Sequence, residues 1–135
     1  MMSLDPNVDK LYINFTKIVF NYCDGAFQQG GNDVPIQYKD TKLYFRGGKI
    51  TRSHFKWLIN TYNFDKASKI IVTGGSAGGV SSFLWSSYVL SIVKNPNVVY
   101  NIPDSGLFLN ANMYGTDFPL VQTALQYLMS LAHKS

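Results

Sequence analysis

The hydrophobic and polar positions of this chain form short apolar runs that alternate with longer amphipathic segments. Three apolar runs are rich in β-branched and aromatic residues, and they predict strands at residues 17–23, 69–73 and 98–102. Apolar residues recur at helical spacing in three other segments, and these predict helices at residues 51–62, 80–94 and 118–132. Because strands that alternate with helices are joined by right-handed crossovers, the pattern predicts an α/β fold with a mostly parallel sheet.

Turn-forming residues divide the first half of the chain. The first predicted strand, which we expect to be buried, stops at Asp24-Gly25, and functional residues often lie at such strand ends. Residues 36–38 and 42–45 are expected to form a hairpin at the edge of the sheet. The pair Gly47-Gly48 closes that hairpin, and Thr51 is expected to cap the helix that follows.

Composition bounds the class of protein. The chain has 135 residues, of which 46% are hydrophobic and 15% charged, so we expect one globular domain over residues 1–135. One cysteine and two histidines exclude an internal disulfide framework and a tetrahedral zinc site, and we expect no metal and no organic cofactor. No apolar run is long enough for a membrane span, and the first residues lack the features of a secretory signal, so a soluble chain without a signal is expected.

The net charge of +4 is spread unevenly. Residues 39–69 hold eight lysines and arginines but only two acidic residues, Asp40 and Asp65. A polyanionic binding partner is therefore one interpretation of this stretch. Clustered arginines and the aromatic motifs of RNA-binding domains are missing, so we expect no nucleic acid partner. A solvated, lysine-rich face is the plainer interpretation of the stretch.

The segment most suggestive of chemistry is Gly74-Gly75-Ser76-Ala77-Gly78-Gly79, which lies between a predicted strand and a predicted helix. It matches Gly-x-Ser-x-Gly, in which a strand reverses into a helix so sharply that the neighbours of the serine must lack side chains. Ser76 is therefore a candidate nucleophile, and the N–H of Ala77 is a candidate donor to an oxyanion. An anion-binding turn and a glycine-rich turn with a buried serine remain alternatives, although the phosphate-loop and dinucleotide patterns are not satisfied.

A nucleophilic serine needs a base and an orienting acid. Ser76, Asp104 and His133 follow the chain order of an α/β-hydrolase triad, which a small self-sufficient esterase would use. His133 stands at the end of a predicted helix and His54 lies in or before another, so both are interpreted as surface or capping residues. Asp104 follows a strand expected to neighbour that of Ser76, but Asp-Ser-Gly is also ordinary turn chemistry.

Four blocks of the sequence share an order and spacing with one known family. They are Tyr22-Cys23-Asp24-Gly25-Ala26-Phe27, Leu43-Tyr44-Phe45-Arg46-Gly47, Gly74-Gly75-Ser76-Ala77-Gly78-Gly79 and Asp104-Ser105-Gly106-Leu107-Phe108-Leu109. Together they cover most of residues 12–115, and the chain resembles the pectin acetylesterase family, which includes plant cell-wall deacetylases and the Notum carboxylesterases.

The resemblance implies a partial, three-layer α/β-hydrolase-like fold and an incomplete domain. It implies that Ser76 is the nucleophile and Ala77 its oxyanion donor, with Asp24 and Asp104 at structural or site-adjacent positions. It further implies removal of an acetyl or other acyl group from a pectin-like polysaccharide or a protein, in a family that is generally secreted. The family's catalytic Asp and His and its second oxyanion segment have no counterpart here, so we expect little or no turnover from this chain. A non-catalytic module that binds carbohydrate or polyanions is the alternative.

Overall fold

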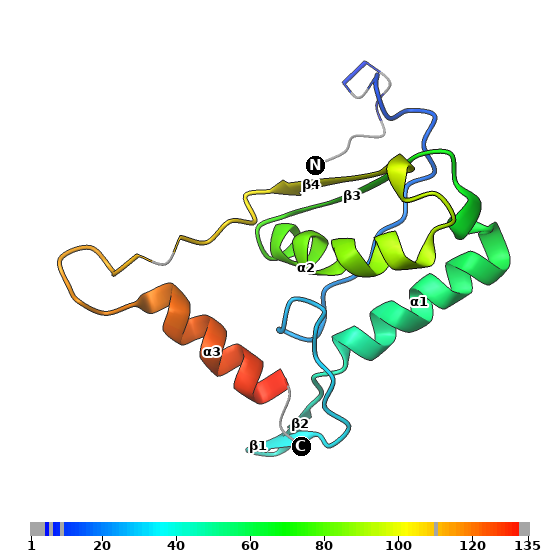
Figure 1. Cartoon of the computed structure of the whole chain (residues 1–135). Coiled ribbons are helices and arrows are strands. Elements are labelled where there is room, and N and C mark those ends of the chain that lie inside the picture. Colours follow the sequence, from blue (N-terminus) through cyan, green and yellow to red (C-terminus); the bar gives the residue numbers. More distant parts are fainter. Residues whose placement is uncertain (1–4, 6, 9, 110, 133–135) are drawn as a thin grey trace.

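The computed structural model describes residues 5, 7–8, 10–109 and 111–132 (Figure 1). Its strands are β1 (Ile36–Tyr38), β2 (Thr41–Leu43), β3 (Ile70–Gly75) and β4 (Val99–Asp104). Its helices are α1 (Gly47–Tyr62), α2 (Ala77–Ile92) and α3 (Leu120–Ala132), with short 3-10 turns at Phe64–Lys66 and Pro96–Val98. None of the described helices is both long and apolar enough to cross a membrane.

The strands form two separate pairs. β3 and β4 are parallel and are connected through α2, and their register sets Gly74 beside Pro103 and Gly75 beside Asp104. β1 and β2 form an antiparallel hairpin. The predicted α/β class, the parallel pairing of the second and third predicted strands and the hairpin itself are therefore confirmed. The expected place of the hairpin at the edge of the parallel sheet is wrong, because β1 and β2 pair only with each other and form a separate sheet.

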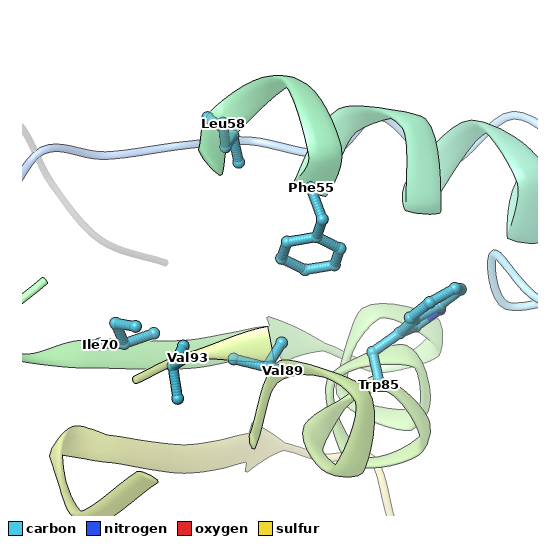
Figure 2. Close-up of a cluster of buried hydrophobic side chains, with 6 residues drawn as sticks. All are labelled: Phe55, Leu58, Ile70, Trp85, Val89 and Val93. Carbon is cyan, nitrogen blue, oxygen red and sulfur yellow. The ribbon is translucent and has the colours of Figure 1, made fainter. Parts of the chain in front are cut away.

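The core lies between α1, α2 and one face of the parallel pair. Figure 2 shows side chains of α1 directed toward α2 and β3, and the cluster consists of Phe55, Leu58, Ile70, Trp85, Val89 and Val93. Phe55 is central, because its ring centroid lies 5.0 to 6.2 Å from those of Phe20, Phe64, Trp85 and Tyr88. This packing holds α2 against the sheet, while α3 stands apart at the end of a long connection (Figure 1).

The predicted strand at residues 17–23 is wrong. This segment forms neither a strand nor a helix, and the side chains of Ile18 and Val19 are 44% and 82% exposed. A strand exists only through pairing with a neighbour, and in the part of the chain that the structure describes β3 and β4 pair only with each other. The segment instead contributes Phe20 to the edge of the core.

The first helix begins earlier than predicted. α1 starts at Gly47, so Thr51 is a buried residue inside the helix and not its cap. The two glycines do not close the hairpin but form the first turn of α1, where both are buried. A Cβ atom on Gly48 would lie 2.9 Å from the carbonyl oxygen of Gln29, so a glycine here lets the neighbouring loop pack against the helix.

Candidate functional site

Ser76 forms the whole connection between β3 and α2. The strand ends at Gly75 and the helix begins at Ala77, so one residue makes the reversal, with φ 52° and ψ −116°. A positive φ is strained for any residue with a Cβ atom. The N–H of Ser76 donates to the carbonyl oxygen of Asp104 at 2.9 Å, which anchors the turn to the end of β4. The side chain of Ser76 is exposed at the carboxyl end of the parallel pair.

We expect Ser76→Gly to be more stable than the wild type by about 1 kcal/mol, because relief of a strain of ~1–3 kcal/mol outweighs the greater freedom of unfolded glycine. Urea unfolding measures the difference. Ser87→Gly is the matched control, since Ser87 lies on the exposed side of α2 and glycine there should cost about 0.5 kcal/mol. Equal destabilisation by both substitutions would show that Ser76 carries no strain.

The four glycines of the motif play two different roles. A Cβ atom on Gly74 would lie 2.5 Å from the carbonyl carbon of Gly78, and one on Gly79 would lie 2.5 Å from the carbonyl oxygen of Asp104. Cβ atoms on Gly75 and Gly78 would meet nothing within 4 Å. Gly74 and Gly79 therefore permit the close approach of α2 to the strands, whereas Gly75 and Gly78 are not required for packing.

The first amides of α2 follow Ser76 directly in the chain, at the carboxyl end of the parallel pair. Ala77 is the first residue of the helix, so its N–H has no acceptor within the helix. Aligned peptide dipoles give a helix N-terminus a partial positive charge, which stabilises an anion there. The turn thus combines an exposed hydroxyl with an amide suited to hold negative charge on a reacting oxygen.

The candidate bases are not assembled around this hydroxyl. No described side chain is hydrogen-bonded to Ser76 Oγ, and the carboxylate of Asp104, although it ends the neighbouring strand, accepts a bond from Ser105 Oγ at 3.0 Å. His54 lies on α1 with its ring stacked on Phe20 at 5.5 Å. His133 lies outside the described residues. The structure therefore brings Ser76 and Asp104 to one sheet edge and places His54 in a different environment.

A buried carboxylate organises the loop that precedes the hairpin. Asp24 is only 7% exposed, and its two oxygens accept four backbone hydrogen bonds. Oδ1 accepts from the N–H groups of Ala26 at 3.0 Å and Gln28 at 3.2 Å. Oδ2 accepts from Gly30 at 3.1 Å and Gly47 at 2.9 Å. Residues 24–30, here called the Asp24 loop, are thereby tied to the first turn of α1.

The Asp24 loop is also tied to the helix that follows Ser76. Ser81 Oγ donates to the carbonyl oxygen of Phe27 at 2.7 Å, and Trp85 Nε1 donates to that of Gln28 at 3.2 Å. Phe27 and Gln28 have φ values of 52° and 58°, so the loop holds two consecutive strained residues. Sequence reasoning placed Asp24 near the site without finding this role, because its partners are backbone amides whose positions no residue pattern reveals.

Comparisons with known proteins identify the family. The profile of the pectinacetylesterase family matches residues 1–133. Pectin acetylesterase 5 of Arabidopsis thaliana is 32% identical over 110 residues, which are 82% of this chain and 25% of that protein. Pectin acetylesterase 4 of the same plant is 28% identical over 110 residues, which are 82% of this chain and 26% of the relative. The chain thus spans about a quarter of the length of these relatives, and no solved structure matches it significantly. On this evidence the chain belongs to the pectinacetylesterase family.

Proposed function

We propose that Ser76 is the nucleophile of a serine esterase that removes acetyl groups from an extracellular, pectin-like polysaccharide. The observation that carries the proposal is the exposed serine at a strained, one-residue turn between a parallel strand and a helix. Membership of the pectinacetylesterase family supports the reaction class. The parallel pair and its helices are compatible with part of a three-layer α/β-hydrolase fold, and we propose that larger architecture as their context.

In the proposed reaction, Ser76 Oγ attacks the carbonyl carbon of the ester while a base takes the hydroxyl proton. Negative charge then develops on the carbonyl oxygen, and the Ala77 N–H at the start of α2 donates a hydrogen bond to it. Collapse of this intermediate releases the sugar hydroxyl and leaves an acyl group on the serine. Water then hydrolyses the acyl-enzyme and regenerates the free hydroxyl. No described side chain bonds to Ser76 Oγ, and we propose that His133 is not the base, so the base is assigned to a part of the enzyme other than these 135 residues.

The same absence of a bonded base among the described residues favours a second candidate function. A chain of this family that lacks a base near its serine would still retain a surface for carbohydrate and act as a binding module. An acylated protein is the other substrate class that the proposed chemistry accommodates.

Labelling of Ser76 distinguishes the esterase from the binding module, because only an activated hydroxyl reacts rapidly with a fluorophosphonate.

We expect the 135-residue chain to hydrolyse p-nitrophenyl acetate no faster than its Ser76→Ala variant and to resist stoichiometric fluorophosphonate labelling. In the protein expressed from the complete gene that carries this chain, we expect Ser76→Ala to lower acetate release from pectin by about 10⁴-fold or more. Ser87→Ala, on the exposed side of the same helix, should keep full activity.

Two results would overturn the proposal. Brisk hydrolysis by the isolated chain that is lost in Ser76→Ala would show that the base is already present in these residues. Retention of acetate release by Ser76→Ala in the protein expressed from the complete gene would remove Ser76 from the role of nucleophile.

A further inference from the structure

A cavity of about 460 Å³ lies between the start of the Asp24 loop, the end of the hairpin and the first half of α1. Its walls include Phe20, Gln28, Tyr44, Arg46, Ile50 and His54. The volume falls within the range of ~300–1,000 Å³ that is typical of small-molecule sites. The lining contains neither Ser76 nor Asp104, so this cavity is separate from the candidate nucleophile.

Arg46 is a fixed cation in the wall of this cavity. Its Nη2 donates to the carbonyl oxygen of Asp33 at 2.6 Å, and its guanidinium carbon lies 4.9 Å from the ring centroid of Tyr44. Its Nε is enclosed without a partner, and no described residue accepts a hydrogen bond from Nη1. The guanidinium is therefore held in place with part of its donor capacity unused, which favours an anionic acceptor.

The nearby carboxylates do not use this capacity. Both oxygens of Asp24, which also lines the cavity, are occupied by four backbone amides. Asp33 is paired with Lys49, whose hydrogen bond and charge lower the pKa of that carboxyl, with a smaller contribution from Arg46. His54, exposed and stacked on Phe20, supplies a second polar group at the wall. The cavity thus offers fixed donors together with the apolar surface of Phe20 and Ile50.

We propose that this cavity binds a uronic acid residue, with its carboxylate on Arg46 and the apolar face of its sugar ring against Phe20 and Ile50. A carboxylate matches the planar guanidinium, and a sugar ring presents C–H groups that pack on apolar side chains. The inference rests on the proposed function for the source of the ligand, because pectin is a polymer of such uronic acids. It adds a place, away from Ser76, at which the polymer chain is held.

Isothermal titration of the 135-residue chain with trigalacturonate tests the proposal, because binding requires no turnover. We expect Arg46→Gln to weaken binding by about 10- to 100-fold, as loss of a charged hydrogen-bond donor predicts. Lys56→Gln removes an exposed cation of α1 outside the cavity lining and should stay within twofold of the wild type. The methyl ester of the trimer and neutral galactotriose should not bind, since neither carries a carboxylate.

Arg46 directly precedes α1, so its replacement changes the residue at the start of the helix as well as the cavity. Ile50→Asp provides a second test that leaves this arginine intact. Ile50 is 50% exposed and lines the cavity, and a carboxylate there should repel trigalacturonate without disturbing the fold. Equal binding by wild type, Arg46→Gln and Ile50→Asp would overturn the proposal, as would equal losses in Arg46→Gln and Lys56→Gln. Ser76→Ala should bind trigalacturonate like the wild type, so failure of the uronate site and failure of the proposed nucleophile are distinguishable.

Discussion

Asp24→Ala is expected to lower the free energy of unfolding by about 3–5 kcal/mol. The substitution removes the acceptor of four backbone N–H groups in one buried site, and each group left unpaired costs ~1–3 kcal/mol unless water reaches it. Since domains of this size are stable by only ~5–15 kcal/mol, much of the folded population would be lost. Urea unfolding followed by circular dichroism measures the change.

The isosteric variant Asp24→Asn sharpens the test. If the amide oxygen keeps the bonds from Ala26 and Gln28, its NH₂ group faces the N–H groups of Gly30 and Gly47, so donors meet donors. We expect Asp24→Asn to lower the free energy of unfolding nearly as much as Asp24→Ala does, although the side-chain volume is unchanged. Asp40→Ala, in the exposed turn of the hairpin, should change stability by less than ~0.5 kcal/mol. A loss at Asp24 no larger than that at Asp40 would refute the organising role of the buried carboxylate.

Gly79→Ala is expected to cost about 3 kcal/mol and to displace α2 from β4. The new methyl group would lie 2.5 Å from the carbonyl oxygen of Asp104 and 2.7 Å from the Cα atom of Gly106, and backbone cannot move aside as a flexible side chain does. Gly78→Ala is a matched control one residue away, because a Cβ atom there meets nothing within 4 Å. Alanine in the helix should stabilise that variant by up to ~1 kcal/mol.

The two substitutions are therefore expected to change the free energy of unfolding in opposite directions, with a decrease for Gly79→Ala and an increase for Gly78→Ala. Thermal or urea unfolding measures both changes. Equal changes in stability for the two substitutions would contradict the close approach of α2 to β4, in which Gly79 packs against the backbone of Asp104 and Gly106. Because the N–H of Ser76 also bonds to the carbonyl of Asp104, displacement by Gly79→Ala should reach the turn itself.

The strand, turn and helix around Ser76 could be predicted because their signals are local. A continuous apolar run, a glycine-rich turn and helical spacing follow one another without a gap, and β3 and α2 flank Ser76 directly. The role of Ser76 as nucleophile remains a prediction, since it depends on a base and no described side chain is hydrogen-bonded to Ser76 Oγ. Its one-residue reversal shows only that the backbone has the geometry that such a role needs.

The features that sequence reasoning missed depend on distant partners. The apolar run at residues 17–23 has the composition of a strand, but composition does not provide a neighbour to pair with. Gly47 resembles a turn residue, and its place in the first turn of α1 becomes evident only when Asp24 is seen to accept its N–H. The cavity at Arg46 is likewise built from two separate stretches of the sequence, residues 20–28 and 44–54, and no spacing in the sequence indicates that they meet.

The Asp24 loop also bears on the order of folding. The bond from Gly47 to Asp24 spans 23 residues, and the bond from Ser81 to Phe27 spans 54. Closing such long stretches costs chain entropy before any contact compensates it, whereas α1 and α2 form from neighbouring residues. The loop is thus expected to dock late, on helices that already exist. Interactions that form after the rate-limiting step slow unfolding and leave the folding rate unchanged, so this buried carboxylate would govern how long a folded molecule survives.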